Sequence, residues 1–125
     1  MRPPNFHLAY IMAVRLSCID AVPSATDAVL TSLPVTIGRG DEADICIRDT
    51  WASRVHCRLC VRDGELYLED LGSCNGTLVN GVRVHDVSIQ RGDQITVGIT
   101  TFRVTYSRLP ESQKSPKSSP MLAGS

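Results

Sequence analysis

The sequence lacks an excess of charge of either sign, because its 13 lysine and arginine residues balance 13 aspartate and glutamate residues. A protein whose principal partner is nucleic acid or an anionic membrane needs a basic excess to bind the phosphate groups. Both kinds of partner are therefore disfavoured. A local group of arginines remains able to bind a single anion.

The chain also lacks an apolar run long enough to cross a membrane, since the apolar stretch at residues 8–14 ends at Arg15. A set of paired cysteines is missing as well. The five cysteines are odd in number and give no secreted disulfide framework. We therefore expect a reducing, cytoplasmic location.

Cys57 and Cys60 form a Cys-x-x-Cys sequence, which in other settings binds zinc or performs redox chemistry. Residues 55–61 alternate between apolar and polar side chains, as a strand does. On a strand, two residues three positions apart point to opposite faces of the sheet. We expect buried or inert thiols here, and no metal or other cofactor.

A length of 125 residues suits one domain, and most of its apolar residues recur with a period of two. Short alternating segments separated by turn signals predict an all-β sandwich or barrel. These segments are 35–37, 45–47, 55–61, 66–68, 95–97 and 102–106. We expect an N-terminal extension at 1–12, a domain at 13–106 and a disordered tail rich in Ser, Pro and Lys at 107–125.

The first segment of the domain is ambiguous. Leu8, Ile11, Met12 and Leu16 fit one stripe of a helix, whereas alternation of apolar and polar residues fits a strand equally well. We favour a first strand at about residues 13–19.

Two Asn-Gly pairs mark tight reversals, because both residue types tolerate positive φ angles. Asn80-Gly81 lies between residues 77–79 and 82–84 and predicts a β-hairpin turn. Asn75-Gly76 follows Ser73 in a loop between two strands. The amide of Asn75 offers donors and an acceptor that suit an extended peptide backbone, although a simple turn asparagine is an equal alternative.

Arg39 and Ser53 are further candidates for binding an anion. Gly38 and Gly40 flank Arg39 and let the backbone bend, so that the guanidinium can project from a loop. Taken alone, Arg39 is more simply a solvated turn residue. Ser53 is also weak evidence by itself, because a serine at the start of a strand often binds a backbone N–H.

His56 follows Ser53 by three residues and, on a strand, would face away from it. This spacing argues against a nucleophile and its base, which must lie within hydrogen-bond distance. We expect a structural histidine that holds neighbouring loops. A hydrolase that uses Ser53 or Cys74 with a histidine is the least favoured hypothesis.

Taken in order, the motifs resemble the signature of the forkhead-associated (FHA) domain. They are Gly38-Arg39, Ser53-Arg54-x-His56, Asp70-x-x-Ser73-x-Asn75-Gly76-Thr77 and Asn80-Gly81, with supporting segments at 34–39, 43–47 and 89–98. The resemblance covers roughly residues 13–106. It implies a β-sandwich of about eleven strands with ligand loops at one end, which binds phosphothreonine peptides without catalysis.

The resemblance also implies a role for each matching residue. Arg39 and Ser53 would contact the phosphate, Arg54 would add a further phosphate or loop contact, and Asn75 would hold the peptide backbone. Cys74 stands in the same loop where the family often has a hydroxyl residue, so a hydrogen bond from that position is in doubt. Architectural roles would fall to Gly38, His56, Gly76, Thr77, Asn80 and Gly81.

The implied partner is a phosphothreonine-containing protein of a Ser/Thr kinase pathway, either a kinase or a kinase substrate. Neither residues 1–12 nor residues 107–125 contain a threonine, so the ligand is expected to arrive in trans. The alternative is an assembly module that keeps the FHA fold and binds its partners without phosphate.

Overall fold

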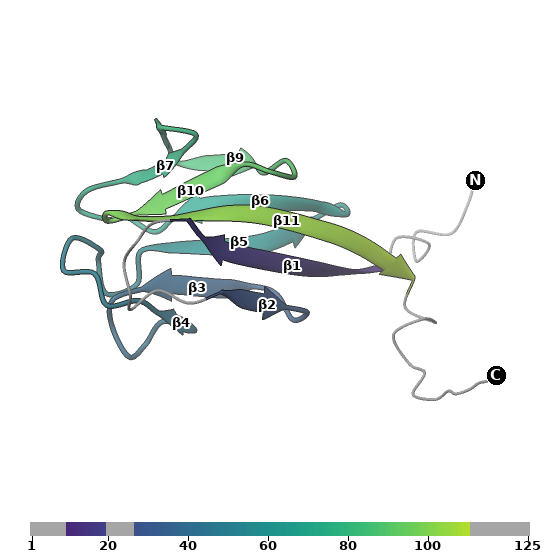
Figure 1. The fold of residues 1–125 in the computed structure, drawn as a ribbon, viewed down its shortest axis with the longest axis horizontal. Coiled ribbons are helices and arrows are strands. Elements are labelled where there is room, and N and C mark those ends of the chain that lie inside the picture. Colours follow the sequence, from purple (N-terminus) through teal and green to yellow (C-terminus); the bar gives the residue numbers. More distant parts are fainter. Residues whose placement is uncertain (1–9, 20–26, 111–125) are drawn as a thin grey trace.

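The computed structural model describes residues 10–19 and 27–110, which form eleven strands in two packed sheets (Figure 1). One sheet has six strands in the order β2-β1-β11-β10-β7-β8, and the other has five in the order β4-β3-β5-β6-β9. The strands are β1 Tyr10–Cys18, β2 Ala28–Leu30, β3 Val35–Gly38, β4 Ile45–Cys46, β5 Cys57–Arg62, β6 Glu65–Asp70, β7 Thr77–Val79, β8 Val82–Val84, β9 Asp86–Ser88, β10 Gln94–Val97 and β11 Thr100–Pro110. The predicted β-sandwich of about eleven strands is confirmed.

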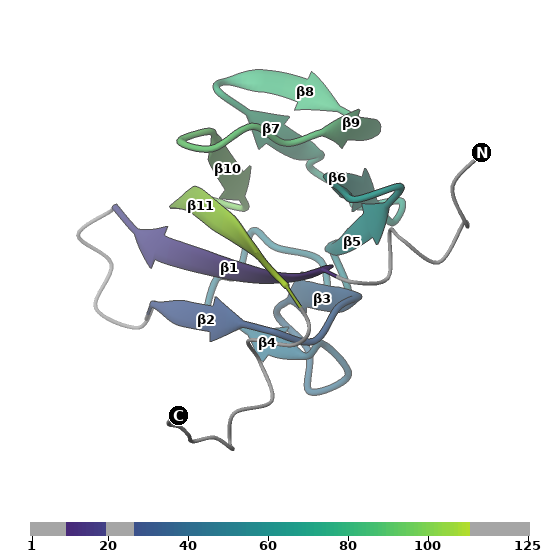
Figure 2. The same ribbon diagram turned by 90° about the vertical axis from the view of Figure 1, so that its right-hand side faces the viewer.

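The core lies between the two sheets. Figure 2, turned by 90° about the vertical axis from Figure 1, shows the two sheets apart from each other. Buried residues alternate with more exposed ones along β5, β6, β10 and β11, and the largest fully buried side chains come from both sheets. They include Leu16, Ile95 and Phe102 from the six-stranded sheet and Ile37, Leu59, Leu66 and Leu68 from the five-stranded sheet. Each contributes about 2 kcal/mol by burial, so the period-two pattern of the sequence holds the layers together.

The first segment of the domain, which the sequence left open between helix and strand, is a strand. It occupies Tyr10–Cys18 rather than the expected 13–19. It pairs along its whole length with β11, from Tyr10 opposite Pro110 to Cys18 opposite Phe102. This pairing extends three residues before the predicted start of the domain at 13 and four residues beyond its predicted end at 106. The two long strands satisfy each other's backbone groups past the edge of the core. The remainder of the predicted extension and tail, 1–9 and 111–125, lies outside the described residues.

Four connections gather at one end of the sandwich, here called the loop end. They are the loops 39–44, 47–56 and 71–76 and the turn 98–99. The strand register shows why. Cys57 pairs with both Ile37 and Asp70 in one sheet, and Thr77 pairs with Val97 in the other. In Figure 1 these connections all lie at the left of the molecule.

The Asn80-Gly81 turn lies at the opposite end, between β7 and β8. Both residues have positive φ angles, 52° for Asn80 and 83° for Gly81, as a tight two-residue hairpin requires. The predicted hairpin is confirmed. Asn80 also fixes the turn to the neighbouring strand, because its amide donates to Asp93 and its side-chain oxygen accepts from the N–H of Gln94.

The two cysteines of the Cys-x-x-Cys sequence lie on β5 in different surroundings. Cys57 is fully buried in the core, and Cys60 is half-buried. Burial, with a smaller contribution from the charge of Asp70, raises the pKa of the Cys57 thiol to about 12. The thiol therefore stays protonated at neutral pH.

Across residues 10–19 and 27–110, no group of His, Cys, Asp and Glu is arranged to hold a metal ion, and no helix is long and apolar enough to cross a membrane.

Candidate functional site

Arg39 begins the loop that follows β3, and two hydrogen bonds hold it against loop 47–56. Its backbone N–H donates to the carbonyl oxygen of Ser53 at 2.9 Å, and its Nε donates to the carbonyl oxygen of Ala52 at 3.0 Å. The side chain is exposed. The guanidinium is thus anchored at one nitrogen, and its two terminal nitrogens remain available to a ligand at the loop end.

Gly38 allows the loops on either side of Arg39 to approach each other. A Cβ atom at this position would lie 2.2 Å from the carbonyl oxygen of Arg54, which is closer than any side chain permits. The N–H of Gly40 donates to the same oxygen at 2.9 Å. Backbone contact, rather than a turn with positive φ, is therefore the reason for the glycine before Arg39.

Ser53 connects loop 47–56 to loop 71–76. Its Oγ accepts a hydrogen bond from the backbone N–H of Cys74 at 3.0 Å. A serine hydroxyl has one proton and two acceptor positions, so this contact uses an acceptor position and leaves the proton for a ligand oxygen. The residue is half-buried and its geometry is fixed from both loops.

His56 is completely buried and joins the same two loops from beneath. Its Nδ1 accepts from the backbone N–H of Ser53 at 2.9 Å. Nε2 therefore carries the ring proton and donates to the carbonyl oxygen of Gly76, also at 2.9 Å. The expectation that His56 faces away from Ser53 is wrong, because β5 begins only at Cys57 and the ring turns back beneath the loop.

Asn75 lies beside Trp51 at the surface of the loop end. One N–H of its side-chain amide donates to the carbonyl oxygen of Trp51 at 2.7 Å. The amide oxygen and the second N–H remain available, and this pair of groups matches an extended peptide backbone. The neighbouring Cys74 is exposed and contributes its backbone N–H to Ser53.

Loop 71–76 is held from inside by the carboxylate of Asp70. The backbone N–H groups of Gly72 and Ser73 donate to one carboxylate oxygen, and the hydroxyls of Ser73 and Thr77 donate to the other. The hydroxyl of Ser73 also accepts from the N–H of Gly76. Burial by itself would raise the pKa of Asp70, but the hydrogen bonds from Ser73 and Thr77 outweigh it and lower the pKa. The carboxylate is therefore charged at neutral pH and fixes the shape of the loop.

Arg54 is exposed, but its side chain is held in an ion pair with Glu42. Its Nε and Nη2 donate to the two oxygens of Glu42, at 3.0 and 2.9 Å. The hydrogen bond from Arg54 lowers the pKa of Glu42, with help from the charges of Arg54 and Arg39. A phosphate contact by Arg54, which the resemblance implies, would fall to the remaining terminal nitrogen, Nη1.

The loops thus bring three of the predicted ligand contacts to one place, and we call Arg39, Ser53 and Asn75 the cradle. Of the predicted architectural residues, Gly38, His56, Gly76 and Thr77 lie beneath or beside it, whereas Asn80 and Gly81 lie at the other end.

The sequence alone assigned no role to Asp49, Asp70 or Ser73, and it named Arg83 only as part of a loop that shapes specificity. Asp70 and Ser73 stand inside the motif that carries the resemblance, so their spacing was a usable signal. Arg83 packs over Gly76, because a Cβ atom on that glycine would lie 2.5 Å from the arginine Nε. Asp49 bonds to residues far along the chain and has no local signal.

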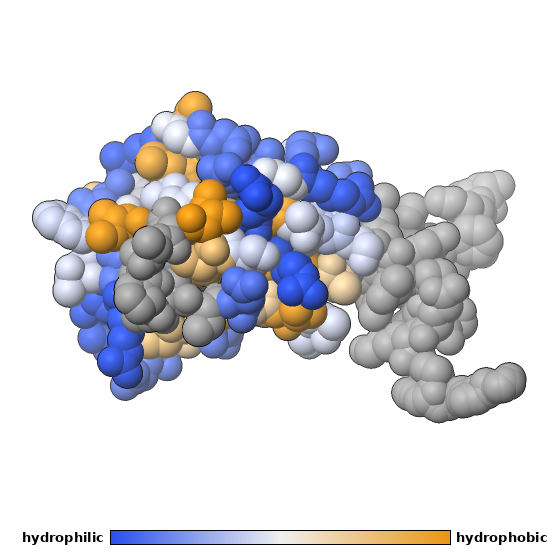
Figure 3. Space-filling model, in the orientation of Figure 1, coloured by the Kyte–Doolittle hydropathy of each residue, from blue (hydrophilic) through white to orange (hydrophobic). Residues whose placement is uncertain are grey.

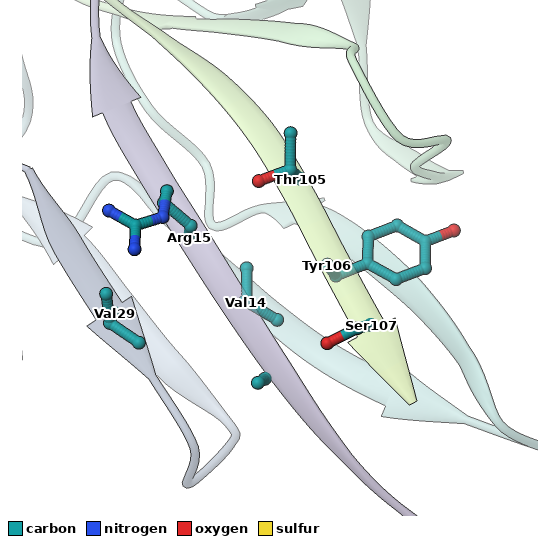
Figure 4. Close-up of a pocket in the computed structure, with 7 residues that line it drawn as sticks. Val14, Arg15, Val29, Thr105, Tyr106 and Ser107 are labelled. Atoms are coloured by element: carbon teal, nitrogen blue, oxygen red, sulfur yellow. The ribbon is translucent and has the colours of Figure 1, made fainter. Parts of the chain in front are cut away.

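A separate hollow of about 270 Å³ lies over β1, β2 and β11 (Figure 4). The labelled side chains of Arg15, Val29, Thr105 and Ser107 come from these three strands. No cradle residue lines it.

Comparison with known proteins places this geometry in a family. The family model for the FHA domain matches residues 35–98. The protein FhaB of Mycolicibacterium smegmatis is 34% identical over 102 residues, which are 81% of this chain and 65% of that protein. FhaB of Mycobacterium tuberculosis is matched over 49% of its length, so the chain spans between about half and two thirds of these relatives.

Solved structures agree with the family model. An FHA domain analysed for phosphothreonine-dependent interactions is 29% identical, with a TM-score of 0.64 over 76% of this chain and 95% of the other. Mycobacterium tuberculosis EmbR, solved with a low-affinity phosphopeptide, is 26% identical, with a TM-score of 0.67 over 74% of this chain and 24% of EmbR. The match of sequence, sandwich and loop end shows that this chain belongs to the FHA domain family.

Proposed function

We propose that the cradle binds phosphothreonine in a partner protein and that the chain acts as a signalling adaptor without catalytic activity. The observation that carries the proposal is the convergence of Arg39, Ser53 and Asn75 from three separate loops. Hydrogen bonds between side chains and backbone groups, and one between two backbone groups, hold these loops together. Two solved relatives support it, one analysed for phosphothreonine-dependent interactions and one holding a phosphopeptide.

The chemistry of the cradle suits a dianion. A phosphorylated side chain carries a charge of about −1.5 to −2 and three strong acceptor oxygens. The terminal nitrogens of Arg39 and the hydroxyl of Ser53 supply donors, and charge-assisted hydrogen bonds contribute about 1.5–3 kcal/mol each. Ordering a flexible peptide offsets part of this gain, so we expect a dissociation constant on the order of micromolar, about −8 kcal/mol.

Threonine is the expected residue type in the ligand. Its γ-methyl group restricts χ1, so less rotamer freedom is lost on binding than for serine, and a small apolar pocket can receive the methyl. The asparagine of the cradle would hold the peptide backbone next to the phosphothreonine. The ion pair of Arg54 with Glu42 uses Nε and Nη2, so a phosphate contact by Arg54 would fall to Nη1.

The partner would be a protein phosphorylated by a Ser/Thr kinase, or the kinase itself, and would bind in trans. Thr26 and Thr31 are the remote exceptions that could bind within the same chain, and Thr26 lies outside the described residues.

A hydrolytic role is disfavoured by the surroundings of Ser53. Both ring nitrogens of His56 are engaged by backbone groups, one by the N–H of Ser53 and the other by the carbonyl of Gly76. The ring therefore has no free nitrogen to take a proton from the serine hydroxyl. The remaining alternative is an assembly module that binds its partner without phosphate.

The test is a phosphopeptide library screened against the purified chain. All peptides carry a fixed central phosphothreonine, and matched libraries carry phosphoserine or unmodified threonine. We expect retention of the phosphothreonine library alone. Equal retention of all three would contradict phosphate recognition and favour the assembly module.

A further inference from the structure

The two outer faces of the sandwich carry their charges differently. On the five-stranded sheet the outward-pointing arginines are paired. Arg58 donates to Glu69 at 2.7 Å, and Arg62 forms ion pairs with Glu69 and, at 2.9 Å, with Asp86. Arg62 also lies over the ring of Tyr67. This face therefore supplies the counter-charges for its own arginines.

The outer face of the six-stranded sheet has arginines without such partners. Apart from these arginines, the described outward-pointing residues of its strands carry hydroxyl, amide and apolar side chains, and none is a carboxylate. The arginines are Arg15, Arg83 and Arg103. Arg83 packs over Gly76 at the loop end. Arg15 and Arg103 are exposed, and neither forms an ion pair within residues 10–19 and 27–110.

Arg15 and Arg103 lie close to each other. Arg15 is opposite Thr105 in the register of β1 and β11, and Arg103 is two residues before Thr105. Diagonal neighbours of this kind on one face of a sheet lie about 7–8 Å apart, so the two positive charges repel. Asp27, just before β2, accepts from the backbone N–H of Cys18 at 3.1 Å and does not pair with Arg15. A counter-charge for the two arginines therefore has to come from elsewhere.

The hollow over β1, β2 and β11 adjoins this pair of arginines. Figure 4 shows the guanidinium of Arg15 between β1 and β2, with Val29 on β2 and the hydroxyls of Thr105 and Ser107 on β11. Val29 is 58% exposed. In Figure 3 strongly hydrophilic surface lies beside hydrophobic surface in the middle of the molecule, where Figure 1 places β1 and β11. A peptide in the hollow would lie close to Arg15 and to both hydroxyl groups.

We propose that the surface around Arg15, Arg103 and Thr105, here called the basic face, is a second docking site that binds an acidic segment of a partner protein. Carboxylates of such a segment would accept charge-assisted hydrogen bonds from the guanidinium groups, and the hydroxyls would add neutral ones. A protein segment suits the face better than nucleic acid, because the chain as a whole has no net positive charge.

The basic face is separate from the cradle. The hydroxyl of Thr100 is held at the loop end by Asp49, and Thr105 lies farther along β11 by about 17 Å of extended strand. The basic face therefore does not depend on phosphothreonine. One partner could still occupy both sites through two segments, and the second contact would then raise the overall affinity without changing the cradle.

The test uses two unphosphorylated peptides and the full chain. One peptide has a leucine flanked on each side by two glutamates, and the other has glutamines in place of the glutamates. Heteronuclear NMR titration measures the affinity and shows which backbone amides the peptide affects. At low salt the acidic peptide should shift signals of β1, β2 and β11, and the glutamine peptide should not. The shifts should decrease at high salt, because the contact is between exposed charges.

Two variants assign the contact to the arginines. Arg15→Gln and Arg103→Gln should each weaken binding of the acidic peptide by at least about threefold. Both should keep the wild-type affinity for a library-selected phosphothreonine peptide. The matched control is Arg48→Gln, which removes an exposed arginine from loop 47–56. It should leave the affinity for the acidic peptide unchanged. Melting temperatures within a few degrees of wild type show that the variants are folded.

Every other outcome overturns the basic face as a docking site. Examples are the absence of shifts with the acidic peptide, equal binding of the glutamine peptide, and unchanged affinity in both arginine variants. Shifts confined to the loop end would show that the peptide occupies the cradle instead. Tighter binding of a single-stranded DNA oligonucleotide of the same charge would contradict a protein partner. Phosphothreonine recognition is measured separately and stands or fails independently of these results.

Discussion

At the scale of single residues, two arginines of the same loop end have different tasks. Arg39 is anchored by Nε to the carbonyl of Ala52 and keeps its terminal nitrogens at the surface. Arg54 is held by both oxygens of Glu42. The glycines around Arg39 made its exposure predictable from the sequence. The ion pair of Arg54 was not, because it joins residues 12 positions apart whose loops meet only in the folded chain.

Glu42 is expected to weaken phosphopeptide binding in two ways. The carboxylate of Glu42 holds Arg54 in an ion pair. Its negative charge also lies close enough to Arg39 for the charge of this arginine to lower the pKa of Glu42. Glu42→Gln should therefore strengthen binding of a phosphothreonine peptide by about twofold to fivefold at low salt, with a smaller gain at high salt. Calorimetry at two salt concentrations checks this.

A suitable control for that variant is Glu65→Gln, which removes an exposed carboxylate from β6, at the end of the strand away from the cradle. It should leave the affinity unchanged. A loss of affinity in Glu42→Gln would show that the carboxylate shapes the site instead of competing with the ligand.

At the scale of elements, buried or partly buried carboxylates hold the ligand loops in place. Asp70 fixes loop 71–76 through contacts within seven residues of the chain, all inside one sequence motif. That arrangement was within reach of sequence reasoning. Asp49 fixes loop 47–56 to a turn 50 residues away. Nothing in the residues around it marks such a contact, since only the packing of the two sheets brings the segments together.

Asp70 should make stability depend on pH. Its pKa is lowered in the folded protein, so the folded state binds fewer protons than the unfolded state near that pKa. The contribution to stability is therefore complete at neutral pH and is lost as pH falls below about 4, through the lowered pKa. Asp70→Asn should reduce the free energy of unfolding at pH 7 by about 1–3 kcal/mol. In this variant the free energy of unfolding should also fall less steeply as the pH is lowered.

Urea unfolding between pH 3 and pH 7 measures both effects. The matched control is Asp63→Asn, an exposed position in the turn between β5 and β6 with a φ of 51°, which asparagine adopts readily. Its unfolding curve should follow wild type. An equally steep acid decline in Asp70→Asn would assign the pH dependence to other groups.

At the scale of the whole molecule, the sequence predicted the class of fold and the order of its turns. Alternation across residues 55–61 and 66–68 and the Asn80-Gly81 turn needed only local information. The ends of β1 and β11 were misplaced, because they depend on each other: Tyr10 pairs with Pro110. Neither segment's sequence alone indicates the pairing between the first and last strands.

The extended pairing predicts where the domain can be shortened. A chain trimmed to residues 10–110 should keep the stability and phosphopeptide affinity of the full chain. Trimming further, to 13–106, removes the pairs from Tyr10–Pro110 to Ala13–Ser107. That loss should lower the free energy of unfolding by about 1–2 kcal/mol and leave the affinity unchanged, because these pairs lie at the end opposite the cradle.

Urea unfolding and calorimetry on the two trimmed chains separate these effects. A loss of affinity in the 10–110 chain would show that residues outside it take part in binding. Equal stability of the two trimmed chains would show that the outer pairs between β1 and β11 contribute nothing.

The central claim is that Arg39, Ser53 and Asn75 form a cradle for a phosphothreonine dianion. The most direct measurement is a calorimetric titration of a library-selected phosphothreonine peptide into wild type and Arg39→Ala, with unfolding monitored in parallel. The cradle predicts that Arg39→Ala stays folded and binds at least about tenfold more weakly. An unchanged dissociation constant in a folded Arg39→Ala protein would contradict it.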